Sequence, residues 1–226
     1  MQRAQEQLEK TVVASTRMEY AIELAQATGL KAVSLTKFAG VPFVYNATKK
    51  TLTERDALQE ERIADAVAQV PALLSVPGSG KQRCIAFEAR VLSKAWHGAL
   101  LNVPSRKQVE RLENALASAS WGNAPLFGRD RTLAMVFTGY RGGALLPNQW
   151  FASRALKAVQ RVLRNHPRLA AKWRAYAANR PATAHVNSPL EGFEELVRRA
   201  GGAVARSGDA VTLGSAEWKL QEFSGA

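Results

Sequence analysis

The stretch Val-Pro-Gly-Ser-Gly-Lys-Gln-Arg, residues 76–83, contains the residue types of a phosphate-binding loop. In such a loop, backbone N–H groups beside glycines surround the phosphates, a lysine contacts them, and a Ser or Thr hydroxyl holds Mg²⁺. The spacing requires a glycine and a hydroxyl at positions where this chain has Ser75 and Gln82. The preceding residues 62–74 also have helical spacing rather than the β-branched run of a buried strand. We therefore interpret the stretch as a connection between two helices, which neither binds ATP tightly nor hydrolyses it.

Other residues capable of catalysis are scattered along the chain. A two-metal site for phosphoryl transfer needs carboxylates that converge within a few ångströms. No two of the four aspartates, Asp56, Asp65, Asp130 and Asp209, are adjacent or spaced to converge from one strand. The chain also has no Gly-x-Ser-x-Gly motif and no spacing typical of metal-binding histidines. We expect no catalytic residue, no metal site and no cofactor, although an unrecognised enzyme could still bring distant Glu and His side chains into one cleft.

The net charge of the chain is strongly positive and unevenly distributed. The sequence has 31 Lys and Arg against 19 Asp and Glu, a formal net charge of +12. A long region of one sign attracts a polyanion, most simply nucleic acid, because neutralising phosphates releases counterions. The alternative is a solvated helix face, although such faces usually mix both signs. Residues 141–180 contain no acidic residue and nine basic ones, namely Arg141, Arg154, Lys157, Arg161, Arg164, Arg168, Lys172, Arg174 and Arg180.

A helix over residues 148–165 would separate its basic residues from its apolar ones. At about 100° per residue, Lys157, Arg161 and Arg164 lie within about 80° of Arg154 around the helix axis. The residues expected on the opposite, inward side are Phe151, Ala155, Val159 and Val162. We predict that the nucleic-acid-binding residues are Arg154, Lys157, Arg161 and Arg164, with Lys172 and Arg174 extending the patch.

Two tryptophans flank this basic region. Trp150 and Trp173 could stack on nucleic-acid bases, as aromatic residues do in many single-strand-binding proteins. Aromatic residues at helix starts and on apolar helix faces are more often part of the core. Both interpretations remain open from the sequence.

The elements that position these residues are predicted to be mostly helices. We expect a mainly α fold with a multi-helix domain, a short β hairpin near residues 31–46 and a small helix-plus-strands unit at the C-terminus. The predicted divisions are an amino-terminal helix and hairpin over 1–52, a helical domain with the basic face over 53–180, and a linker with a small α/β unit over 181–226. The expected helices cover residues 5–28, 53 to a stop near Pro71 to Pro77, 81–101, 105–119, 129–138, 148–165, 168–179 and 189–200.

Three short motifs occur in order along the chain: Gly29-Leu30, the stretch Lys-Phe-Ala-Gly-Val-Pro-Phe over 37–43, and Trp121-Gly122. This order resembles the region downstream of the catalytic palm in reverse transcriptases of non-LTR retrotransposons. The chain differs from that family in having Ala39 where Leu is usual, in a shorter spacing before Lys37, and in lacking the Phe/Tyr-x-Asp-Asp motif. The resemblance implies a helical thumb and connection that grips a template–primer duplex without an active site.

The sequence therefore predicts a non-catalytic nucleic-acid-binding protein or fragment with RNA or DNA as its partner. The alternative is a helical protein-interaction module whose basic face binds an acidic partner. A single cysteine, Cys84, excludes an internal disulfide and suits a reducing compartment. The charged first ten residues and the absence of an apolar run of about eighteen residues favour an intracellular chain, cytoplasmic or nuclear, without a membrane span.

Overall fold

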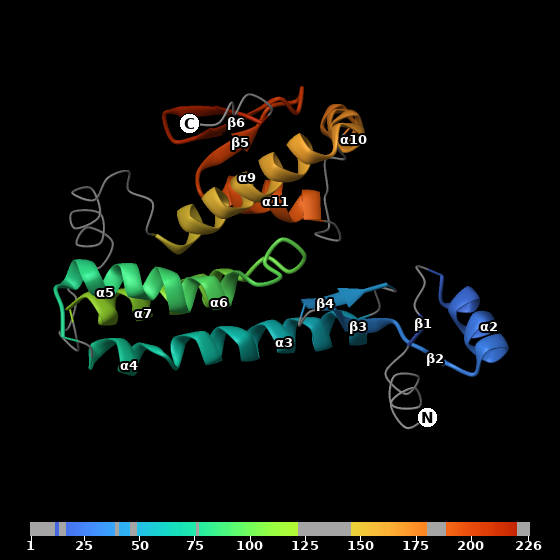
Figure 1. Ribbon diagram of the computed structural model, residues 1–226, viewed down its shortest axis with the longest axis horizontal. Helices are drawn as coiled ribbons and strands as arrows, with labels where there is room; N and C mark the ends of the chain where they lie inside the picture. Colours follow the sequence, from blue (N-terminus) through green and yellow to red (C-terminus); the bar gives the residue numbers. More distant parts are fainter. Residues whose placement is uncertain are drawn as a thin grey trace. The chain divides into compact units, whose positions relative to one another are not determined.

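Helices dominate the structure, a computed structural model, and the strands are short (Figure 1), so the predicted mainly α fold class is confirmed. The structure describes residues 12–13, 17–38, 41–45, 49–75, 77–121, 146–179 and 189–220. The contacts group the chain into two units, Met1–Glu61 and Arg62–Ala226, where the sequence predicted three divisions. Helix α3, Lys49–Val67, runs through the boundary between the units and begins four residues before the expected start at Thr53.

The first unit contains helix α2, Met18–Thr28, the predicted hairpin and the first part of α3. Helix α2 ends at Gly29, whose φ of 69° is the left-handed conformation that glycine adopts without strain. Strands β3, Leu35–Phe38, and β4, Val41–Val44, pair antiparallel as expected. The helix expected over 5–28 is wrong at residues 12–13, because the two β-branched valines form strand β1. Strand β1 pairs in parallel with β2, Lys31–Ala32.

The second unit contains most of the described helices. A continuous helical path from Gly80 to Trp96 includes a π-helical segment, in which the Ser93 N–H donates to the Glu88 carbonyl. The helix expected over 81–101 ends at Trp96, five residues early, and Gly98 shortly after it has a φ of 85°. The helix expected over 129–138 lies outside the described residues. The helical elements are α4 (Val70–Leu74), α5 (Gly80–Phe87), η1 (Glu88–Leu92), α6 (Ser93–Trp96), α7 (Arg106–Trp121), α9 (Pro147–Asn165), α10 (Pro167–Ala178) and α11 (Pro189–Arg199).

Residues 77–79 lie between helices α4 and α5, and Gly80–Arg83 form the first turn of α5. The Ser79 hydroxyl accepts from the Gln82 N–H at 3.3 Å, and the Gln82 side-chain oxygen accepts from the Ser79 N–H at 2.8 Å. This reciprocal pair is a capping box that satisfies two N–H groups at the start of α5. The prediction that Cys84 lies on a helix beginning near Lys81 is confirmed. Directly before the glycines, the described residues 70–75 and 77 include the helix α4, Val70–Leu74, and no strand.

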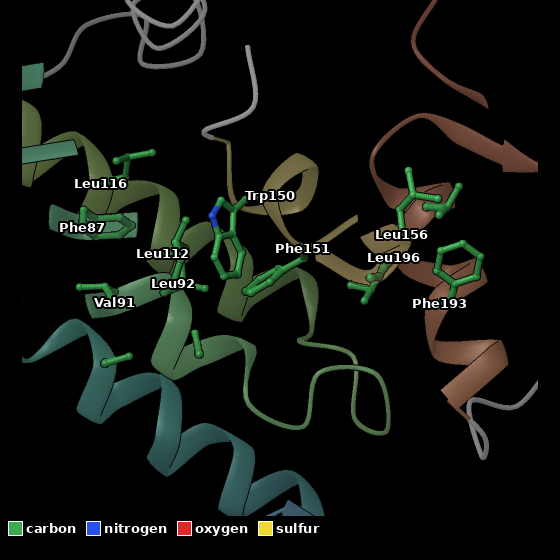
Figure 2. Close-up of a cluster of buried hydrophobic side chains, with 14 of the residues drawn as sticks. Phe87, Val91, Leu92, Leu112, Leu116, Trp150, Phe151, Leu156, Phe193 and Leu196 are labelled. Atoms are coloured by element: carbon green, nitrogen blue, oxygen red, sulfur yellow. The ribbon is translucent and has the colours of Figure 1, made fainter. Parts of the chain in front are cut away.

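The hydrophobic core of the second unit joins helices that are far apart in the sequence. Figure 2 shows side chains from α5, η1 and α7 close to side chains from α9 and α11. The Trp96 ring packs against Trp150 and Phe151 of α9, with centroid separations of 6.3 and 6.1 Å. At Gly192 of α11, an added Cβ would lie 1.9 Å from the Leu100 carbonyl oxygen, so the absence of a side chain permits this close approach.

The predicted helix-plus-strands unit at the C-terminus is present. Strands β5, Gly202–Val204, β6, Ala210–Leu213, and β7, Ala216–Lys219, form an antiparallel sheet in that order. The turns between them contain Gly208 and Gly214, with φ values of 73° and 62°, at the two places that the sequence indicated. The sheet, red in Figure 1, forms hydrogen bonds with both α9 and α10.

Candidate nucleic-acid interface

Helix α9 carries the residues predicted to bind nucleic acid. Pro147 lies in its first turn, where a missing N–H costs nothing, and the helix ends at Asn165 before His166 and Pro167. Phe151, Ala155 and Val159 are buried as expected, but Val162 is 45% exposed, so its predicted inward position is wrong. The buried arc also includes Leu156 and Leu163, and its centre is displaced away from Val162.

The four predicted residues of α9, Arg154, Lys157, Arg161 and Arg164, are all exposed. We call these four residues the basic strip. At about 100° per residue they lie on the side of the helix opposite Ala155 and Val159. Within the described residues, no carboxylate forms an ion pair with Lys157, Arg161 or Arg164. These three charges can therefore approach a polyanion without first leaving an ion-pair partner among the described residues.

Arg154 is in a different environment from the rest of the basic strip. Its guanidinium nitrogen lies 3.5 Å from a Glu88 carboxylate oxygen. Its guanidinium carbon lies 5.0 Å from the centre of the Trp150 ring, within the range of a cation–π contact. Because Glu88 already balances this charge, Arg154 has less to offer a phosphate than the other three residues.

The two α10 residues predicted to extend the patch also differ from each other. Lys172 is exposed. The Nε of Arg174 donates to the Asp209 carboxylate at 3.1 Å, and about half of each side chain is exposed. The ion pair connects α10 to the turn before β6. Arg174 therefore helps to attach the sheet and also adds positive charge to the surface.

The two tryptophans considered for base stacking belong to the core. Trp150 is 3% exposed and Trp173 only 1%, so neither ring face is open to a base. The Trp173 N–H donates to the Gly208 carbonyl oxygen at 2.6 Å, and its ring contacts Tyr176 and Phe193 with centroid separations of 6.0 and 5.7 Å. The core interpretation is confirmed for both residues.

A groove lies between α9 and the C-terminal sheet, and the sequence did not reveal it. Its volume is about 770 Å³. Three members of the basic strip, Lys157, Arg161 and Arg164, line the α9 side. The opposite side includes Leu213, Gly214 and Ala216 around the β6–β7 turn, and Trp218 of β7. The only sequence signal was an aromatic residue in a short strand close to basic residues, which is too common a pattern to indicate a site.

The described part of the chain offers no cluster of three or more His, Cys, Asp or Glu side chains able to hold a metal ion. Cys84 is fully buried, and its sulfur lies 3.0 Å from the Ser120 hydroxyl. Burial raises the pKa of the Cys84 thiol, while the Ser120 hydrogen bond and the Arg83 charge oppose this effect only in part. A buried thiol with a raised pKa is a poor nucleophile.

Among the described residues, no helix has both the length and the apolar character needed to cross a membrane.

Comparisons of the chain with protein-family models, with curated proteins and with solved structures found no match.

Proposed function

We propose that this protein binds nucleic acid through the basic strip of α9 and that it does so without catalysis of its own. The observation that supports this function is the exposure of Lys157, Arg161 and Arg164 along one side of a helix, with no ion-pair partner in the described residues. Along the helix axis these three residues cover about 10 Å, which suits contacts with successive phosphates of one strand. Such contacts fix position and carry no sequence information, so sequence preference is low.

The resemblance to the thumb and connection of non-LTR reverse transcriptases supports the same kind of function. In that setting the basic strip would lie along the backbone of a template–primer duplex, and the polymerase active site would belong to another segment. We propose an intracellular place of action, because nucleic acid is found there and the single cysteine is a free thiol.

The test is equilibrium binding of the full chain to duplex DNA, duplex RNA and polyglutamate over a range of salt concentrations. Both nucleic acids should bind, with log Kobs falling linearly as log salt rises. A strip variant replaces Lys157, Arg161 and Arg164 by Ala. For this variant on duplex DNA, the slope of log Kobs against log salt should be smaller in magnitude by up to about 2.7, because each of the three phosphate contacts contributes about 0.9.

A control variant removes the same charge elsewhere, by replacing the exposed residues Arg90, Arg106 and Lys107 by Ala. It should lose far less affinity than the strip variant, because a local contact and not net charge determines binding. Both variants should fold, since exposed side chains contribute little to stability. Equal losses in the two variants would contradict the proposal, and tighter binding of polyglutamate than of either nucleic acid would favour the acidic-protein alternative.

A further inference from the structure

We propose that the groove between α9 and the C-terminal sheet is a nucleobase-stacking site for unpaired nucleic acid, with Trp218 as the stacking residue. This inference rests on the proposed function and adds a substrate class to it. The basic strip alone would serve a duplex, whereas the groove provides a place for a base that is not paired.

The size of the groove favours a nucleotide over a duplex. Its volume of about 770 Å³ falls within the range of about 300–1,000 Å³ that is typical of pockets for small molecules. A flipped-out or single-stranded nucleotide can enter a space of this size, but the body of a duplex cannot.

The two sides of the groove carry complementary chemistry. One side has the cationic side chains of Lys157, Arg161 and Arg164, which suit phosphates. The other side has Trp218, which is 38% exposed although Trp150 and Trp173 are almost fully buried. A cationic surface beside an exposed aromatic ring is the usual composition of single-strand-binding sites, because every base has a face that can stack.

The groove is held in shape before any ligand arrives. The side-chain nitrogen of Gln160, which lines the α9 side, donates to the Lys219 carbonyl oxygen at 3.2 Å. This bond joins α9 to β7 next to Trp218 and orients the Gln160 amide beside the groove. Further along the sheet, the Trp173 bond to Gly208 and the ion pair of Arg174 with Asp209 attach the sheet to α10. A preformed site loses less freedom on binding than one that must assemble.

The polar side chains on the α9 side of the groove fit a nucleobase better than an apolar ligand. Gln149, Ser153 and Asn165 line the groove together with Gln160. Amide and hydroxyl groups can pair with the donor and acceptor edges of any base. Because Trp218 stacks without reading these edges, the groove discriminates between bases only weakly.

The experiment compares three labelled ligands on the full chain: oligothymidylate, an abasic oligomer with the same number of phosphates, and a blunt duplex. Trp218→Ala should weaken oligothymidylate binding by about 5- to 100-fold, which corresponds to the loss of one stacked base. The same variant should leave binding of the abasic oligomer and of the duplex unchanged. Trp218→Phe keeps an aromatic face and should restore most of the affinity, which a purely structural role of Trp218 would not predict.

The outcomes separate this inference from the proposed function. The stacking proposal is wrong if Trp218→Ala binds oligothymidylate as tightly as the unaltered chain does. It is also wrong if this variant loses as much affinity for the abasic oligomer as for oligothymidylate. Nucleic-acid binding itself then still stands, provided that the strip variant loses affinity for the duplex. If the unaltered chain binds none of the three ligands, both the proposed function and the stacking site are wrong.

Discussion

Trp173 donates its indole N–H to the carbonyl oxygen of Gly208, 2.6 Å away, and so connects α10 to the turn between β5 and β6. The bond is buried, and Gly208 lies so close to the indole that an added Cβ would be 3.0 Å from the Trp173 nitrogen. This buried hydrogen bond, together with the Gln160–Lys219 bond and the Arg174–Asp209 ion pair, attaches the sheet that forms one side of the groove.

Replacing Trp173 by Phe should destabilise the protein. The Gly208 carbonyl would lose its partner and the smaller ring would leave a void, together lowering the free energy of unfolding by about 2–4 kcal/mol. Urea denaturation followed by far-UV circular dichroism measures this change. The matched control is Trp218→Phe, which alters an exposed ring and should change stability by less than about 0.5 kcal/mol. Equal stability of the two variants would show that the indole N–H does not hold the sheet.

Members of the basic strip should contribute unequally to nucleic-acid binding. Arg161→Ala should lower the log–log salt slope by about 0.9, whereas Arg154→Ala should lower it less, because Glu88 already pairs with Arg154 at 3.5 Å. Glu88→Gln removes that competition and should strengthen binding at low salt. Fluorescence anisotropy titrations at several salt concentrations give the slopes. A slope change as large for Arg154→Ala as for Arg161→Ala would show that Glu88 does not withhold this charge.

The stability contributed by Glu195 of α11 should depend on pH. Burial raises the pKa of the Glu195 carboxyl, but hydrogen bonds from Arg198 and Arg199 and both positive charges outweigh burial, so the net pKa is below its ordinary value. The closest of these contacts are 2.7 Å to Arg198 and 2.6 Å to Arg199. Because the folded-state pKa is lowered, this stability is complete above the ordinary carboxyl value and is lost as the pH falls through the lower folded value.

Glu195→Gln should therefore lower the free energy of unfolding by about 1 kcal/mol near pH 7, a value reduced by the exposure of Arg198. The difference from the unaltered chain should narrow as the pH falls below about 4.3. Thermal unfolding over a series of pH values measures both effects. Glu217→Gln on the exposed strand β7 is the control and should have little effect at any pH. A difference that stays constant down to the acid limit would contradict the assigned pKa direction.

The thiol of Cys84 should react slowly in the folded protein. Its side chain is fully buried and burial raises its pKa, so both access and the thiolate fraction are low at neutral pH. Iodoacetamide labelling followed by mass spectrometry should be slow under native conditions and fast in concentrated urea. The chain has no other cysteine, so the signal belongs to this residue alone. Rapid labelling of the folded chain would show that α5 opens readily from α7.

Features determined by local chemistry could be predicted from the sequence. Gly29 ends α2 because a positive φ is needed there, and Pro167 separates α9 from α10 because proline cannot continue a helix. The turns of the C-terminal sheet were likewise visible at Gly208 and Gly214. Each of these signals acts within a few residues, so no knowledge of the tertiary structure was needed.

Features that depend on distant partners could not be predicted in this way. Strand β1 exists through pairing with β2, about twenty residues later, and short pairings of this kind leave little pattern in the sequence. Val162 is exposed because the elements that pack on α9 do not cover its side of the helix. The spacing of apolar residues in the sequence does not show which side these elements cover. The groove needs Gln160 and Lys219, which are 59 positions apart, to meet across two elements. The candidate residues of α9 were therefore found from the sequence, but the wall containing Trp218 was not.

Because of the capping box of α5, a variant of this protein could match the nucleotide-binding sequence motif without having its structure. Replacing Ser75 by Gly and Gln82 by Ser would give Gly-Val-Pro-Gly-Ser-Gly-Lys-Ser, a complete match to the nucleotide-binding pattern. The same change would remove the Gln82 oxygen that accepts from the Ser79 N–H, and the residues before it would still be the helix α4. The variant that matches the motif would thus be less stable than the unaltered chain. It would also still lack the strand that precedes a phosphate-binding loop.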